Sequence, residues 1–221
     1  MKKYLFVLLL IVSLSILLAV ESAPSETVGY VKYPSVVGFN FAAMPMDDGM
    51  TLVSEVGMYM GPNDEIDAIF LWNNSGQYWD GCTNYGGGFW DPDLPVGPGS
   101  VLYYSSFYAF DYYSIGTMPA ANAQYNIVPG FNTIMIPLNR SDLTLVSEVG
   151  NDIGPADEID AIFLWNNAGQ YWDGCTNYGG GFWDPDLPVS IGTPRYISSS
   201  AAITWPAGPR GEVRASSSRS K

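Results

Sequence analysis

Tryptophans and carboxylates recur side by side in this chain, in a pattern that suits ligand binding. Trp79 directly precedes Asp80, and Trp90 begins the run Trp-Asp-Pro-Asp. An aromatic face beside polar groups can stack on a sugar ring, although large aromatic side chains also fill small hydrophobic cores. The same residues recur 93 positions later. The candidate ligand-binding residues are therefore Trp79, Asp80, Trp90, Trp172, Asp173 and Trp183.

Paired acids point to a second kind of chemistry. Asp91 and Asp93 flank a proline, and Asp184 and Asp186 do so again. Oxygen-rich loops outside cells can hold Ca²⁺, which takes six to eight oxygen ligands. The spacing does not match the Asp-x-Asp-x-Asp-Gly type of calcium loop. These four residues are candidate calcium ligands, with turn-forming aspartates on a solvated acidic surface as the alternative.

Composition argues against catalysis. The chain has no histidine, which excludes a serine-histidine-aspartate or cysteine-histidine nucleophile within it. A carboxylate hydrolase needs two carboxyl groups facing one cleft at a defined spacing, and no two acids here are marked as such a pair. We therefore expect a protein that is not an enzyme and keep a carboxylate hydrolase as the third hypothesis.

The two cysteines, Cys82 and Cys175, occupy the same position in two copies of a repeat. A disulfide between them requires that this position lie at the interface between the copies, because the two Cα atoms must come within about 7 Å. The alternatives are two separate buried thiols, or pairing between molecules.

Charge and the chain ends indicate the compartment. The formal net charge is −13, which makes nucleic acid an unlikely partner. In residues 1–22, Lys2 and Lys3 follow Met1 and precede an apolar run, as in a secretory signal peptide. An uncleaved membrane anchor is the alternative. We expect no membrane span after removal of the signal peptide, and secretion or display at a cell surface. Residues 209–221 form a basic tail, either solvated or docked on the acidic body of a neighbour.

A long internal repeat dominates the sequence. Residues 51–96 and 144–189 differ at only five of 46 positions. A repeat of this length is a domain-sized unit rather than one turn of a solenoid. We predict two tandem homologous domains, residues 27–119 and 120–208, packed as a pseudo-symmetric pair.

The elements that must position the candidate residues are mostly strands. β-branched and aromatic runs bounded by glycine and proline predict strands around a Gly-Phe-Asn turn, and a hairpin whose loop spans residues 73–77. The tyrosine-rich strands at 103–113 predict a closing hairpin with one aromatic face, which would pack on the second copy or on another molecule. Thr51 and Thr144 are expected to cap one short helical turn per copy that ends at Gly57 or Gly150. The predicted fold class is all-β, with two β-sandwich or barrel-like domains.

The order of motifs resembles a class of secreted bacterial tandem β-repeat proteins, known mainly from environmental genomes. The motifs are Gly-Phe-Asn (38–40 and 130–132), Trp-Asn-x-x-Gly-Gln-x-Trp (72–79 and 165–172) and Gly-Phe-Trp (88–90 and 181–183). The resemblance implies extracellular β repeats and carries no activity or site residues with it.

The leading functional hypothesis is a non-catalytic secreted structural or adhesive module that self-associates or binds a cell-surface or extracellular polymer. The alternative is a carbohydrate-binding module that uses exposed tryptophans, with a glycan as partner and calcium as the only cofactor considered.

Overall fold

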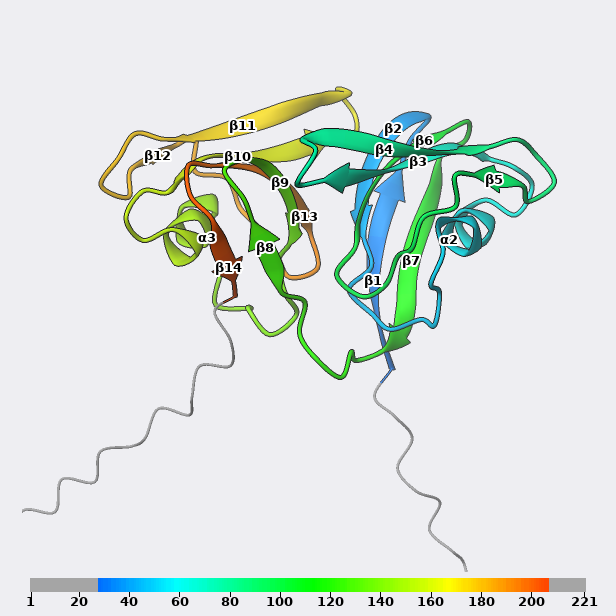
Figure 1. Cartoon of the computed structure of the whole chain (residues 1–221), viewed down its shortest axis with the longest axis horizontal. Helices are drawn as coiled ribbons and strands as arrows, with labels where there is room; N and C mark the ends of the chain where they lie inside the picture. Colours follow the sequence, from blue (N-terminus) through cyan, green and yellow to red (C-terminus); the bar gives the residue numbers. More distant parts are fainter. Residues whose placement is uncertain (1–27, 207–221) are drawn as a thin grey trace, which may run out of the picture.

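The computed structural model describes residues 28–206, which form two β-rich repeats side by side (Figure 1). The signal peptide expected over residues 1–22 and the basic tail expected over 209–221 lie outside the described residues. In the part of the chain that is described, no helix is long and apolar enough to cross a membrane. The first repeat forms β1 (Val28–Ser35), β2 (Gly38–Ala43), α2 (Val53–Met60), β3 (Ile66–Asn73), β4 (Tyr78–Asn84), β5 (Trp90–Asp91), β6 (Val101–Ser106) and β7 (Phe110–Thr117).

The second repeat follows the same plan with a shorter closing ribbon. It contains β8 (Tyr125–Ile127), β9 (Gly130–Met135), α3 (Val146–Ile153), β10 (Ile159–Asn166), β11 (Tyr171–Asn177), β12 (Trp183–Asp184), β13 (Pro194–Ser199) and β14 (Ile203–Trp205). The predicted all-β, two-domain organisation is confirmed.

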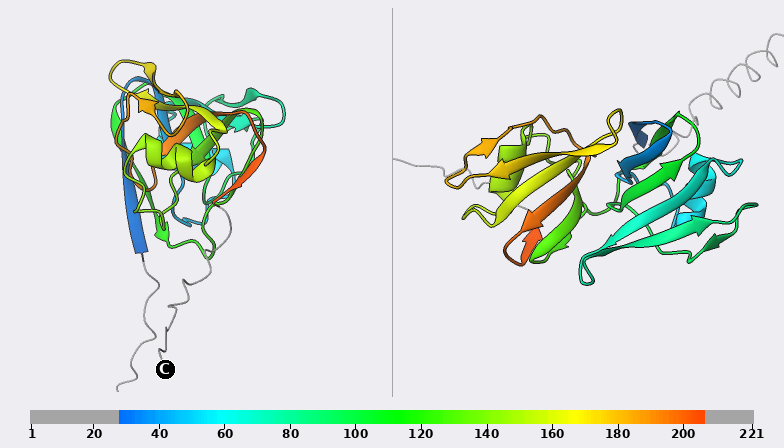
Figure 2. Two further views of the ribbon diagram at one scale, coloured as in Figure 1. Left: turned by 90° about the vertical axis from the view of Figure 1, so that its left-hand side faces the viewer. Right: turned by 90° about the horizontal axis from the view of Figure 1, so that it is seen from above.

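Each repeat has an open five-stranded antiparallel sheet and a separate two-stranded ribbon. The sheet order is β2-β6-β3-β4-β5 in the first repeat and β12-β11-β10-β13-β9 in the second. The ribbons pair β1 with β7 and β8 with β14. The sheets stay open, so the sandwich-like form of the prediction describes the repeats better than the barrel-like form. The edge strands β2 and β9 each face the other repeat (Figure 2).

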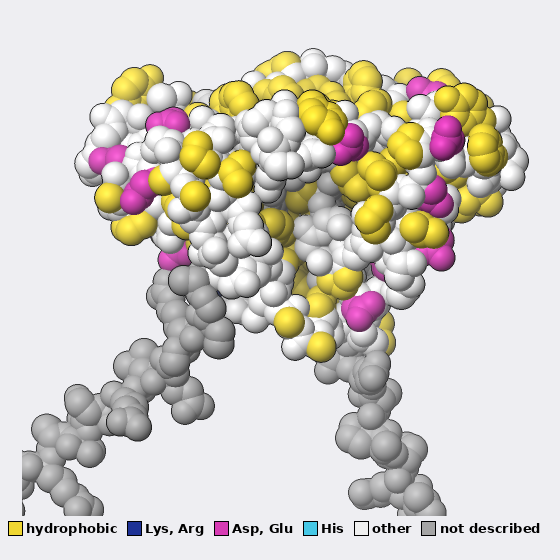
Figure 3. All heavy atoms as spheres, in the orientation of Figure 1, with side chains coloured by type: hydrophobic (Ala, Val, Ile, Leu, Met, Phe, Trp, Pro, Cys, Tyr) yellow, Lys and Arg dark blue, Asp and Glu magenta, His cyan; other side chains and the backbone are white. Residues whose placement is uncertain are grey.

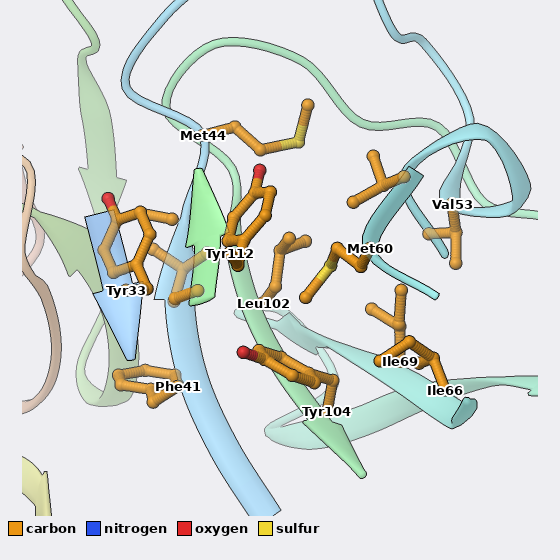
Figure 4. Close-up of a cluster of buried hydrophobic side chains, with 14 of the residues drawn as sticks. Tyr33, Phe41, Met44, Val53, Met60, Ile66, Ile69, Leu102, Tyr104 and Tyr112 are labelled. Carbon is orange, nitrogen blue, oxygen red and sulfur yellow. The ribbon is translucent and has the colours of Figure 1, made fainter. Parts of the chain in front are cut away.

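The core of each repeat lies between the sheet, the helix and the ribbon. In the first repeat Ile69 from β3, Leu102 from β6 and Val53 from α2 are fully buried (Figure 4). Alternation along β3 and β6 sends these side chains, together with Tyr104, to the core face of the sheet. It sends Phe70, Trp72 and Tyr103 to the other face. The outer face of each sheet is therefore free to pack on the other repeat.

The helices are longer than predicted, because the glycine expected to end each one lies inside it. Val53–Met60 forms two turns, and Gly57 is buried within them. A Cβ at Gly57 would lie 2.2 Å from the ring of Trp90, so this glycine allows the indole to approach the helix. The N-cap is Leu52 rather than Thr51, and the carboxylate of Glu55 accepts the backbone N–H of Leu52 at 3.1 Å. Gly150 and Trp183 repeat this arrangement in the second copy.

The predicted closing hairpins are wrong, because the two strands of each do not pair with each other. β6 pairs with β2 and β3, whereas β7 pairs with β1 in the ribbon. The chain therefore leaves the sheet at residues 107–109 and crosses to the other side of the core. β13 and β14 separate in the same way.

Three of the five differences between the near-identical segments lie on the helix, at residues 58–60 and 151–153. The helix contacts the two-stranded ribbon, and the ribbons of the two repeats differ in sequence. Tyr59 of α2 donates to the backbone oxygen of Tyr113 in β7. Its counterpart Asp152 accepts the indole N–H of Trp205 in β14 at 2.7 Å and also bonds Arg140. Each helix thus carries the side chains that hold its own ribbon.

Candidate functional site

The tryptophans predicted to bind a ligand from the hairpins instead join the two repeats. The ring centroids of Trp79 and Tyr196 lie 5.8 Å apart in a stacked arrangement, and those of Trp172 and Tyr103 lie 6.0 Å apart. All four side chains are half-buried. We call this contact the aromatic seam, which comprises Phe41, Trp72, Trp79, Tyr103, Trp165, Trp172 and Tyr196. Tyr103 and Tyr196 lie against the rings of Trp79 and Trp172, and sugar binding by these two tryptophans stays a prediction.

Reciprocal hydrogen bonds surround the seam. Gln77 accepts the backbone N–H of Phe131 at 2.7 Å and donates to its carbonyl at 2.9 Å. Gln170 makes the same two bonds to Phe39, at 2.7 Å and 2.8 Å. The indole N–H groups of Trp72 and Trp165 donate to the same two carbonyls. Each hairpin therefore binds the Gly-Phe-Asn turn of the other repeat, as the predicted pseudo-symmetric pairing requires (Figure 2).

The Gly-Phe-Asn turn is built for this contact. Gly38 has a φ of 103°, and a Cβ there would lie 2.6 Å from Oε1 of Gln170. Asn40 is buried and bonds both the N–H and the carbonyl of Val36 at 2.8 Å, which fixes the turn. Phe39 lies on an edge strand, so the glutamine amide also occupies backbone groups that another strand could otherwise pair with.

Trp90 and Trp183 are buried rather than exposed. Their exposed fractions are 5% and 4%, and each packs beneath the helix of its repeat, against Gly57 or Gly150. Their assignment as ligand-binding residues is wrong, because the segment that carries them re-enters the core.

The aspartates of the hairpins have a local structural role. Asp80 and Asp173 each accept a hydrogen bond from an asparagine at the end of the preceding strand, Asn73 at 3.0 Å and Asn166 at 3.2 Å. These bonds connect β3 to β4 and β10 to β11 beside the seam. The structure places neither carboxylate on an open ligand surface beside an exposed tryptophan.

One candidate calcium ligand of each pair caps a helix. Asp93 accepts the backbone N–H of Ser54 at 2.9 Å and its hydroxyl at 2.7 Å, and Asp186 does the same for Ser147. Carboxylates at a helix N-terminus satisfy free N–H groups and interact favourably with the helix dipole. Asp91 and Asp184 are exposed on the short edge strands. Over residues 28–206, no three acidic or cysteine side chains gather as a metal-binding group, and calcium binding stays a prediction.

The two cysteines remain free thiols. Cys82 belongs to the core of the first repeat and Cys175 to that of the second. Burial raises the pKa of both thiols. The candidate disulfide is contradicted, because the repeats meet through the outer faces of their sheets while the cysteines point into the cores.

The most exposed aromatic pairs lie elsewhere, at two equivalent loops that sequence reasoning missed. Tyr85 and Phe89 are 66% and 62% exposed, and their ring centroids lie 5.9 Å apart. Tyr178 and Phe182 are 67% and 63% exposed, with centroids 6.0 Å apart. We call residues 85–89 and 178–182 the aromatic tips. The tips lie between β4 and β5 and between β11 and β12, at opposite ends of the molecule (Figure 1).

Each tip is ordered despite its three glycines. The N–H of Tyr85 bonds the carbonyl of Phe89 at 2.8 Å, and Asn84 accepts the N–H of Gly86 at 2.8 Å. Asp64 accepts the N–H of Gly87 at 3.0 Å and a bond from the side chain of Asn84. These hydrogen bonds, that from Gly87 first, lower the pKa of Asp64, and the same contacts lower that of Asp157 in the second tip. The two rings are thus presented on a preformed loop.

One signal in the sequence pointed to the tips. In Tyr-Gly-Gly-Gly-Phe the glycines have no side chains to pack against the flanking rings, so the rings are left at the surface. The adjacent Trp90 does not share this exposure, because its ring packs against Gly57 of the helix.

The charges of the described residues are strongly unbalanced. Residues 28–206 contain 19 acidic and three basic side chains. Arg140 and Arg195 are buried, and Lys32 is paired with Asp111 at 2.7 Å. Figure 3 shows acidic side chains spread over the visible face, with hydrophobic ones among them.

No family model, curated protein or solved structure matches the chain. The resemblance to secreted bacterial tandem β-repeat proteins therefore stays a prediction.

Proposed function

We propose that this protein is a non-catalytic adhesive module that acts outside the cell and joins two points of an extracellular material through its aromatic tips. The observation that supports this function is the equivalence of the tips. Residues 81–96 and 174–189 are identical, and the two exposed aromatic pairs lie at opposite ends of the molecule (Figure 1). Contiguous exposed aromatic surface is typical of an interaction site.

The joint between the repeats supports the same proposal. Two binding sites strengthen each other only when both can engage at once, and a stiff connection holds them at a fixed separation. The aromatic seam and the reciprocal glutamine bonds provide such a connection. A module of this kind needs no reactive side chain, in keeping with the absence of histidine.

The test compares binding of the protein to particles with its ability to cross-link those particles. Suspended particles of chitin, cellulose or gelatin, and vesicles of phosphatidylcholine, are mixed with the full chain and scored for retained protein and for agglutination. We expect retention and agglutination with at least one surface. Tyr85→Ala with Phe89→Ala removes one tip and should abolish agglutination while leaving retention measurable. Removing the second tip as well should abolish both.

A matched control uses a third exposed aromatic pair. Phe107 and Tyr108 are 57% and 64% exposed, and their counterparts in the second repeat are Ser200 and Ala201. Phe107→Ser with Tyr108→Ala should agglutinate as well as the parent chain. Agglutination that survives the loss of both tips, or an absence of binding to every surface, would refute the proposed function.

A further inference from the structure

We infer that each aromatic tip binds an uncharged polysaccharide, with one or two sugar rings seated on each pair of side chains. This inference rests on the proposed function and specifies its ligand class. It assigns the binding to Tyr85, Phe89, Tyr178 and Phe182 rather than to any tryptophan.

The size of the tip favours a small, repeated ligand unit over a protein surface. A large aromatic side chain offers roughly 150–250 Å² when fully buried, so two rings about two-thirds exposed offer roughly 200–330 Å². A stable protein–protein interface needs about 800 Å² from each partner. Each tip is too small for that but large enough for one or two sugar rings.

The shape and chemistry of the tip suit a sugar ring. Pyranoses have apolar C–H faces and a hydroxyl rim, which match an aromatic face with polar groups at its edge. Between the two rings of the first tip, a Cβ at Gly87 would meet no atom within 4 Å, so the backbone there is open to a ligand. The exposed carboxylate of Asp91 follows two residues after Phe89 and can accept hydrogen bonds from hydroxyl groups.

Charge selects among polymers. With 19 acidic against three basic side chains over residues 28–206, the body repels sulfated or uronic polysaccharides and anionic membranes. No basic residue lies within either tip, at 85–89 or 178–182. An uncharged polysaccharide incurs no such repulsion.

The identity of the two tips favours a ligand that presents the same unit many times. Two copies of one site gain from a polymer because the second contact forms at a high effective concentration, which raises overall affinity by about 10²–10⁴-fold. The hydrogen bonds of Asp64 to the tip backbone hold the rings in place before binding, which lowers the entropy cost.

The experiment measures binding isotherms of the full chain on chitin, cellulose and mannan, with alginate gel, gelatin beads and phosphatidylcholine vesicles as competing classes. We expect binding to at least one uncharged polysaccharide, elution by soluble oligosaccharides of that polymer, and little change in 1 M NaCl. Single-tip variants should bind 10-fold or more weakly than the parent chain, and the double-tip variant should not bind. Phe107→Ser with Tyr108→Ala should match the parent.

Folding of each variant is checked by its thermal transition, which removal of exposed rings should leave unchanged. Elution by oligosaccharide tests the unaltered chain and needs no variant. Agglutination of gelatin beads or vesicles alone would overturn the ligand class and leave the adhesive function standing. Binding to alginate alone would likewise overturn the uncharged ligand class and leave the adhesive function standing. Polysaccharide binding that persists without the tips would overturn the assignment of residues.

Discussion

Gln77 and Phe131 form a two-point contact in which a side-chain amide stands in for a neighbouring strand. The amide accepts from the N–H and donates to the carbonyl of Phe131, at 2.7 Å and 2.9 Å. Gln77 adopts a left-handed φ of 56°, unusual for a residue other than glycine. With the backbone in this conformation, the amide of Gln77 reaches Phe131 of the other repeat.

Replacing both glutamines should loosen the joint between the repeats. Gln77→Ala with Gln170→Ala removes four hydrogen bonds to exposed strand edges, with an expected loss of roughly 1–3 kcal/mol of unfolding free energy. Urea denaturation measures the stability, and X-ray scattering measures the spread of particle dimensions. Gln124→Ala is the control, because Gln124 lies outside the hairpins. An unchanged midpoint and unchanged scattering would show that the glutamine bonds do not hold the joint.

Gly57→Ala should destabilise the protein although alanine favours helices. The gain in helix propensity is about 1 kcal/mol, while the new Cβ would lie 2.2 Å from the ring of Trp90. Overpacking of this kind costs about 1–3 kcal/mol or more, so we expect a lower melting temperature. Gly97→Ala, where a Cβ would meet nothing within 4 Å, should melt as the parent does. A rise in melting temperature for Gly57→Ala would contradict the close contact.

Arg195→Leu should stabilise the second repeat. Arg195 is buried, its Nε has no partner among the described residues, and burial lowers its pKa to about 10. Its counterpart in the first repeat is Leu102, which is fully buried. Removing a poorly paired buried charge commonly gains about 1–4 kcal/mol.

The pH dependence of this effect has a definite sign. Below pH 10 the guanidinium is charged in both states, so its burial disfavours folding by a constant amount. Between pH 10 and the ordinary pKa of 12.5 the unfolded chain holds more protons, and the cost declines as pH rises. Urea midpoints at pH 7 should therefore be higher for Arg195→Leu, and Leu102→Arg should lower them by the equivalent of about 3 kcal/mol or more. A lower midpoint for Arg195→Leu would mean that the arginine is well paired.

Asp152→Ala should release β14, the last strand of residues 28–206. Asp152 accepts the indole N–H of Trp205 at 2.7 Å and pairs with Arg140, and both partners are buried. Removing this carboxylate from Trp205 and Arg140 should lower the free energy of unfolding by about 2–4 kcal/mol. Hydrogen exchange of β14 amides should accelerate selectively. Asp67→Ala is the control, because Asp67 is exposed on β3 of the first repeat and should leave the exchange of β14 unchanged.

The tips should lose their order in acid. The folded pKa of Asp64 and of Asp157 lies below the ordinary 3.8 because each carboxylate accepts a glycine N–H. Their contribution is therefore complete above that pH and is lost as pH falls through the lower folded value. The amide proton shifts of Gly87 and Gly180 should titrate with midpoints below 3.8. Asp64→Asn should remove the Gly87 titration alone. Midpoints at or above 3.8 would show that the bonds do not form.

Several features of the fold follow directly from local sequence. The hairpin of β3 and β4 turns where residues 73–77 predict, and the repeat gives two equivalent units. Tyr103 faces the second repeat, as the aromatic alternation of its segment indicates. These features depend on periodicity and turn chemistry, which act within a few residues.

The functional roles were harder to predict because they depend on partners distant in the chain. The role of Gln77 depends on a backbone segment 54 residues away, and that of Asp93 on a helix 39 residues away. Trp90 and Phe89 are neighbours in sequence, yet one is buried and the other exposed. The glycine run beside Phe89 points to its exposure, but no local pattern predicts the burial of Trp90, because the helix that covers it is placed by the whole core.

The binding of each hairpin to the other repeat has a consequence for a chain that a protease cuts between the repeats. The segment between β7 and β8, residues 118–124, is the one covalent link between the repeats. The reciprocal bonds and the aromatic seam do not involve it. A chain cut in this segment would keep its two repeats joined through these contacts, and it would still migrate as one particle under native conditions.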